Sequence, residues 1–105
     1  MVSFGEEEKL QDPQIRDMVR WCQQEDGSFW RNYCNIYFET VNDITANFEL
    51  SGHGESFKFC FPHGYKVKDG VTVFLAWAEE NESKQQMSSL YGVLNSLNSA
   101  YSCPK

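Results

Sequence analysis

Apolar and polar residues alternate along much of the middle of this chain, between Cys34 and Ala78. Alternation with a period of two is typical of β-strands in a sheet that has one solvent-exposed face. The pattern predicts strands over residues 34–40, 44–50, 56–61, 65–68 and 71–78. The Asp69-Gly70 pair between the last two favours a tight hairpin turn. Between the strands over residues 34–40 and 44–50, only a loop with an odd number of residues puts the apolar side chains of both strands on the same face. We therefore predict a three-residue loop there, with Asn42 or Asp43 in the left-handed conformation.

The two ends of the chain carry helical patterns instead. Asp12 and Pro13 are favoured at a helix start, and the following apolar residues recur at helical spacing to about residue 24. A second helix is expected from residues 81–83, where Ser83 and Gln86 fit a capping box, to residue 101. Its apolar stripe comprises Met87, Leu90, Tyr91, Leu94, Leu97 and Tyr101.

These elements predict an α+β fold. An antiparallel sheet of four or five strands in a meander would carry the N-terminal and C-terminal helices on one apolar face. With 105 residues, the chain favours a single domain, over residues 12–102, preceded by an acidic arm over residues 1–11. The expected core comprises Ile36, Phe48, Phe57, Phe59 and Leu94.

Charge narrows the classes of partner. The formal net charge is −6, which argues against nucleic acid and anionic membranes as ligands and permits a basic protein partner. No run of residues approaches the about 20 apolar positions of a membrane span. The acidic N-terminal segment does not resemble a signal peptide, so we expect a cytoplasmic protein.

Four cysteines occur, at positions 22, 34, 60 and 103. Cys22 falls in a predicted helical stripe, and Cys34 and Cys60 fall in predicted strands. In a cytoplasmic protein we expect reduced thiols, of which the first three behave as small hydrophobic side chains.

A metal or thiol site would have to use His53, Cys60 and His63. The two histidines lie at opposite ends of a predicted six-residue strand, about 17–20 Å apart, which is too far for two ligands of one zinc ion. Cys60 and His63 could still form a nucleophile–base pair, but no third residue is suggested to orient the base. We therefore expect no metal and no cofactor.

Aromatic residues outside the apolar stripes are the best candidates for partner binding, because Trp and Tyr are enriched in binding hot spots. They fall in one stretch that also holds charged residues. The predicted partner-binding residues are Trp21, Glu25, Asp26, Phe29, Trp30, Arg31, Tyr33 and Tyr37. The competing interpretation is a second small core beneath the segment that joins the first helix to the first strand.

No catalytic motif is present in the sequence. We therefore expect a small acidic non-enzymatic interaction protein: a stoichiometric inhibitor, an immunity protein or an anti-defence protein. A second hypothesis is a homodimeric chaperone-like or adaptor module, by analogy of architecture. A third is a metal- or thiol-dependent protein that uses Cys60 and His63.

Overall fold

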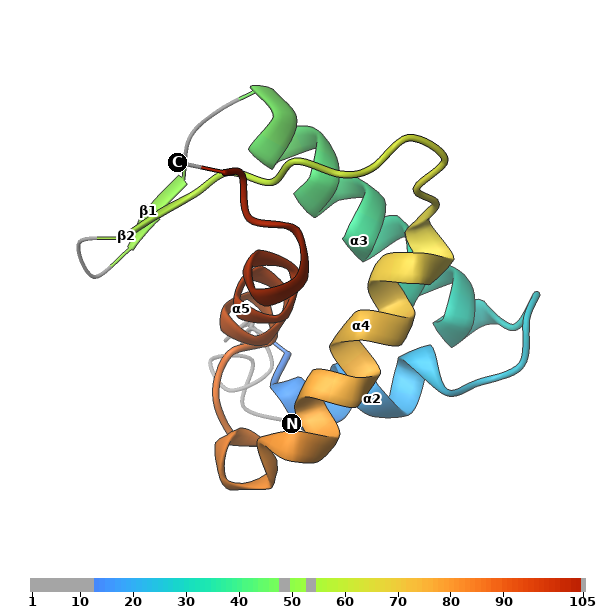
Figure 1. Cartoon of the computed structure of the whole chain (residues 1–105). Helices are drawn as coiled ribbons and strands as arrows, with labels where there is room; N and C mark the ends of the chain where they lie inside the picture. The colour runs from blue at the N-terminus through green and yellow to red at the C-terminus, as the bar shows by residue number, and fades with distance from the viewer. Residues whose placement is uncertain (1–12, 48–49, 53–54, 105) are drawn as a thin grey trace, which may run out of the picture.

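The computed structural model describes residues 13–47, 50–52 and 55–104, and within them the fold is mainly helical (Figure 1). The elements in chain order are α2 (Ile15–Cys22), α3 (Phe29–Asn47), strands β1 (Leu50–Gly52) and β2 (Glu55–Phe57), α4 (Val67–Glu80), a 3₁₀ helix η1 (Glu82–Lys84) and α5 (Ser89–Tyr101). The predicted α+β fold with a four- or five-stranded sheet is therefore wrong. The described strands form one short antiparallel hairpin, in which Leu50 pairs with Phe57, and it lies apart from the helices in Figure 1.

The first of the misassigned segments is α3. Its buried residues Cys34, Phe38, Val41 and Thr45 recur at helical spacing, whereas Ile36 is exposed. Residues 34, 36 and 38 fit a period of two and residues 34, 38 and 41 fit a period of 3.6, so the short apolar run was ambiguous. The predicted left-handed loop at Asn42 or Asp43 is also wrong, because both residues lie inside the helix.

The second misassigned segment is α4. The Asp69 carboxylate accepts a hydrogen bond from the Lys66 backbone N–H, at 2.9 Å, and so caps the helix start instead of forming a hairpin turn. Val71, Phe74 and Ala78 are buried on one side of this helix. The apolar run at residues 71–78, which was predicted to be a strand, is thus part of a helix packed against both α3 and α5.

The two predicted helices exist, with shifted limits. α2 begins at Ile15 after an extended Gln14, and the Asp17 carboxylate accepts a hydrogen bond from the Gln14 N–H at 2.9 Å. α5 begins after Ser88, whose hydroxyl accepts a hydrogen bond from the Leu90 N–H at 3.1 Å, so the box expected at Ser83 is not the cap.

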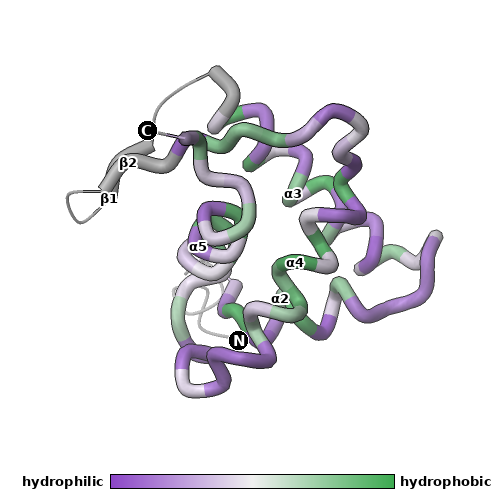
Figure 2. The backbone as a smooth tube through the Cα atoms, in the orientation of Figure 1, coloured by the Kyte–Doolittle hydropathy of each residue, from purple (hydrophilic) through white to green (hydrophobic). Residues whose placement is uncertain are grey.

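The core lies where α2, α3, α4 and α5 meet. Figure 2 shows hydrophobic stretches on these helices, whereas the connections after α2 and after α4 are hydrophilic. Phe59 and Leu94 are buried as predicted, and Ile36 is not. Phe48 and the side chain of Phe57 lie outside what the structure describes.

Two disulfides close the structure, and the prediction of reduced thiols is wrong. Cys22 at the end of α2 bonds to Cys34 on α3, and Cys60 bonds to Cys103 after α5. The Cα atoms are 5.3 Å and 4.9 Å apart, within the normal range for a disulfide. Cys22, Cys34 and Cys60 were expected to act as small hydrophobic side chains, but the course of the chain brings the four cysteines together in pairs.

Candidate protein-interaction surface

Four aromatic side chains gather where α2 meets the start of α3. Trp21 and Trp30 stack with ring centroids 4.8 Å apart, and Tyr33 meets both edge-on, at 5.1 Å and 5.7 Å. Phe29 meets Trp30 edge-on at 4.9 Å. We call Trp21, Phe29, Trp30 and Tyr33 the aromatic cluster. The stretch singled out in the sequence is thus brought together, with Phe29, Trp30 and Tyr33 exposed.

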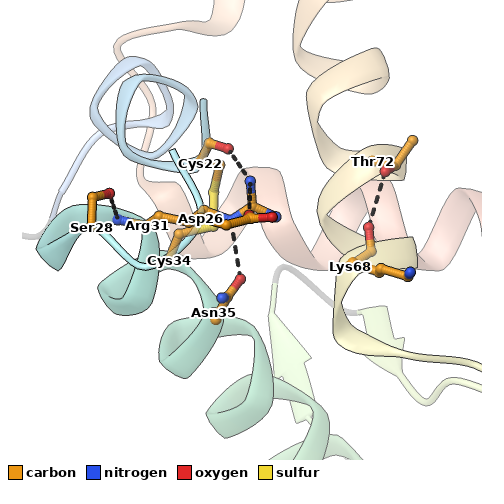
Figure 3. A network of polar contacts seen from close by, with 8 residues as sticks. All are labelled: Cys22, Asp26, Ser28, Arg31, Cys34, Asn35, Lys68 and Thr72. Atoms are coloured by element: carbon orange, nitrogen blue, oxygen red, sulfur yellow. Dashed lines mark hydrogen bonds and ion pairs between the residues drawn. A yellow bond between two sulfur atoms is a disulfide. The ribbon is translucent and has the colours of Figure 1, made fainter. Parts of the chain in front are cut away.

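The Cys22–Cys34 disulfide fixes this cluster in place, because it bonds the end of α2 to the second turn of α3 (Figure 3). Arg31 adds a second tie. Its guanidinium donates to the Cys22 carbonyl at 3.0 Å and to Asn35 Oδ1 at 3.3 Å. Arg31 is therefore a positioning residue on the inner side of the helix rather than an open contact.

The remaining predicted partner-binding residues also divide into exposed side chains and side chains that hold the fold together. Asp26 is exposed and lies 3.7 Å from the Arg31 guanidinium, and Glu25 is exposed beside it. Tyr37 is half-buried, and its hydroxyl lies 2.9 Å from the Ser89 hydroxyl across the α3–α5 contact. Glu25 and Asp26 therefore flank the aromatic cluster, while Tyr37 mainly joins two helices.

The exposed apolar surface extends well beyond the predicted residues. Within the described part of the chain, the large exposed hydrophobic side chains lie on α3 or around the start of α5: Phe29, Trp30, Tyr33, Ile36, Ile44, Met87 and Leu90. A groove of about 360 Å³ lies among four of them, Tyr33, Ile36, Ile44 and Leu90, and Tyr33 also belongs to the aromatic cluster. This α3 groove is lined by Tyr33, Ile36, Tyr37, Thr40, Val41, Ile44 and Leu90.

Sequence reasoning missed Ile36, Ile44 and Leu90 as surface residues because each fitted an apolar stripe. The signal that could have found them is the helical period of α3. With Cys34, Phe38 and Val41 inward, Ile36 and Ile44 fall outside the buried face. Leu90 is exposed because α5 turns Val93, Leu94 and Leu97 toward the core instead.

A second hollow, the acidic pocket, lies beside the α3 groove. It is lined by Glu39, Asn42, Asp43, Phe61, Tyr65 and Val67. The Phe61 and Tyr65 rings stack with centroids 4.0 Å apart, and the Asn42 side-chain N–H donates to the Tyr65 hydroxyl at 3.3 Å. Burial raises the pKa of the Tyr65 phenol above its ordinary value of 10.0, the Asn42 hydrogen bond lowers this pKa, and Tyr101 and Asp69 raise it.

The thiol on which the third hypothesis depends is not free in the structure. Cys60 is bonded to Cys103, so it has no thiolate to attack a substrate or ligate a metal. Across the described ranges, no three His, Cys, Asp or Glu residues are grouped to hold a metal ion. His53, the remaining member of the predicted site, lies outside the described residues. None of the described helices is long and apolar enough to cross a membrane.

Fold and surface together define a small, disulfide-linked helical protein whose large exposed apolar side chains, among the described residues, gather on α3 and around the start of α5. The chain belongs to the family of Rap1a immunity proteins, whose family model matches residues 14–103. No curated protein and no solved structure matches the chain. The family membership agrees with the predicted immunity class of inhibitor, and an immunity protein acts on a protein partner, a toxin.

Proposed function

We propose that this protein neutralises a toxin by binding it stoichiometrically, without catalysis, through the aromatic cluster and the adjoining α3 groove. The observation that carries the proposal is the concentration of exposed aromatic and aliphatic side chains on α3 and the start of α5. Contiguous apolar surface of this kind marks interaction sites, and Trp and Tyr dominate binding energy where they are buried by a partner.

Two features suit this surface to tight binding. It is built on a helix that a disulfide and the Arg31 hydrogen bonds hold in place, so little conformational entropy is lost on association. It is also flanked by carboxylates: Glu25 and Asp26 at one end, Glu39 and Asp43 toward the other. Together with the net charge of −6, these favour a basic toxin and faster encounter at low salt.

Two expectations from the sequence stay predictions. One is a homodimer, for which size-exclusion chromatography with light scattering is the direct measurement. The other is a cytoplasmic location. Disulfides are rare in cytosolic proteins, so the pairing of all four cysteines removes one ground for that location.

The test compares the protein with Phe29→Ala/Ile36→Ala, two side chains that are 72% and 58% exposed and therefore contribute little to folding. Partners are captured from source cells at low and high salt, identified by mass spectrometry and expressed alone in susceptible cells. We expect one captured protein to stop growth, and co-expression of the wild-type chain to restore it. The double variant should bind this toxin at least about tenfold more weakly, a loss of about 1.4 kcal/mol.

Thr72→Ala is the matched control, since Thr72 is exposed on α4, away from the surface. It should protect cells as the wild type does. A captured partner that is harmless when expressed alone, or a toxin that the wild-type chain binds without protecting cells, would contradict the proposed function. If the double variant bound the toxin as tightly as the wild type, the binding surface would lie elsewhere on the protein.

A further inference from the structure

We propose that the acidic pocket takes an arginine side chain of the toxin while apolar neighbours of that arginine fill the α3 groove. This inference rests on the proposed function and deepens it, because it names the chemistry by which the C-terminal half of α3 recognises its partner. It assigns a role to residues that neither the aromatic cluster nor the α3 groove uses.

The first observation is the composition of the pocket walls. Glu39 and Asp43 supply two carboxylates from α3, and Phe61 and Tyr65 supply a stacked aromatic pair. Of the residues that the structure describes, no Lys, Arg or His lines this hollow of about 470 Å³. A guanidinium suits such walls, because it stacks on aromatic faces and pairs with carboxylates through several N–H donors. An anionic group would meet two like charges there.

The second observation is an acceptor that the fold leaves unused. Asn42 lines the same pocket, and its Oδ1 is buried without a hydrogen-bond partner, while its side-chain N–H bonds to Tyr65. An unsatisfied buried acceptor is costly and calls for an explanation. A guanidinium that enters the pocket brings N–H donors to this amide.

The third observation is that the helix itself does not favour these acids. Glu39 and Asp43 are four residues apart on α3, and like charges at this spacing destabilise a helix. Of the two, Asp43 also lies near the C-terminal end of α3, where the helix dipole disfavours acids, and the last turn of α3 holds no basic residue. A cation bound between them relieves both effects.

The fourth observation is continuity with the apolar surface. Ile36 and Thr40 of the α3 groove lie three residues before Glu39 and Asp43 of the acidic pocket, so these side chains are neighbours on the surface of α3. A toxin segment that crosses the exposed side of α3 between these neighbours can reach both hollows. An arginine next to an apolar residue on that segment fits both hollows.

The test uses Nα-acetylarginine amide as the probe and the citrulline analogue, which keeps the shape but lacks the charge, as its control. NMR of the isotope-labelled full chain follows the Asn42 side-chain amide and the backbone amides of residues 39–43. We expect saturable shifts with arginine and none with citrulline. Glu39→Gln/Asp43→Asn should abolish the shifts, whereas Glu79→Gln/Glu80→Gln, an equal change of charge at the end of α4, should leave them intact.

Equal shifts with both probes, no shift with arginine, or shifts that survive in Glu39→Gln/Asp43→Asn would each overturn the inference. The captured toxin provides an independent comparison, in which we expect Glu39→Gln/Asp43→Asn to bind about tenfold more weakly than Glu79→Gln/Glu80→Gln. Equal neutralisation of the toxin by the two variants would contradict the arginine-binding role of the acidic pocket but not the proposed immunity function. Failure of the wild-type chain to protect cells from the toxin would contradict the proposed immunity function, whatever the NMR shifts with Nα-acetylarginine amide show.

Discussion

Small residues on α5 set how closely that helix approaches its neighbours. Gly92 is buried, and a Cβ atom added there would lie 2.7 Å from Ile15 Cγ1 and 3.2 Å from Phe74 Cε1. Ile15 and Phe74 are themselves fully buried, so neither can move into solvent to make room. A glycine that looks like a weak point in a helix is therefore a packing requirement.

We expect Gly92→Ala to destabilise the protein by about 1–3 kcal/mol through overpacking, which outweighs a gain in helix propensity of up to about 1 kcal/mol. Urea denaturation followed by circular dichroism measures the difference. Ser99→Ala, an exposed change in the same helix, should shift stability by less than about 0.5 kcal/mol. A Gly92→Ala variant as stable as wild type would mean that α5 does not sit this close to α2.

Tyr65 makes a residue-scale prediction about alkaline pH. Its folded-state pKa is raised, chiefly by burial, so the folded state holds the phenol proton more tightly than the unfolded state. The resulting stabilisation is fully present below the unfolded-state pKa of about 10 and is lost as pH rises through the folded-state value. We expect the free energy of unfolding to fall above pH 10, and less steeply in Tyr65→Phe. Identical slopes for the two proteins would contradict this.

At the scale of elements, the two disulfides differ in their surroundings. Cys22 and Cys34 are at most 1% exposed, and their bond joins α2 to α3 beneath the aromatic cluster. Cys60 is exposed, and its bond joins the segment after β2 to the end of α5. That junction also carries a hydrogen bond from the Cys60 N–H to the Tyr101 carbonyl, at 2.8 Å.

We expect a mild reductant to open Cys60–Cys103 first, because thiol–disulfide exchange needs access to a sulfur atom. Alkylation of the new thiols followed by peptide mass spectrometry reports which disulfide is reduced first. In denaturant, where both disulfides are accessible, their rates of reduction should no longer differ. The protein with only Cys60–Cys103 reduced should still bind the toxin, because the proposed binding surface is built on α2 and α3. Labelling of Cys22 and Cys34 before Cys60 and Cys103 would contradict the order.

At the scale of the whole molecule, the first and last described helices, α2 and α5, are connected directly. The Ile15 N–H donates to the Met87 carbonyl and the Ser89 N–H donates to the Pro13 carbonyl, each at 2.8 Å. These bonds place the start of α5 beside the start of α2. Leu90 thereby joins α3 residues in one surface, although it is distant from them in sequence.

The sequence predicted the helices at its ends because each has a start signal and several turns of apolar residues at helical spacing. It failed for α3 and α4, where aromatic and β-branched residues favour strands locally. In α3, packing of Phe38 and Val41 against the other helices overrides that preference. In α4, the Asp69 that suits a hairpin also suits a helix start, where its carboxylate caps the Lys66 N–H, and Gly70 is buried inside the helix.

The candidate surface was predictable in part, for the same reason. The aromatic cluster was found because Trp21, Trp30 and Tyr33 fitted no apolar stripe. Ile36 and Ile44 were missed because a strand assignment turned them inward, and the role of Arg31 depends on a carbonyl nine residues away. Contacts of that kind follow from the course of the helices, which local patterns did not give.

The cross-links have a consequence for how the protein withstands proteases. Residues 23–33 and 61–102 are each closed into a covalent loop, and these loops contain the exposed turn at residues 25–28 and the connection between α4 and α5. Exposed turns are where proteases usually cut. A single cut in either loop leaves both halves of the chain joined in one molecule, so α3 stays attached to the helices that support it.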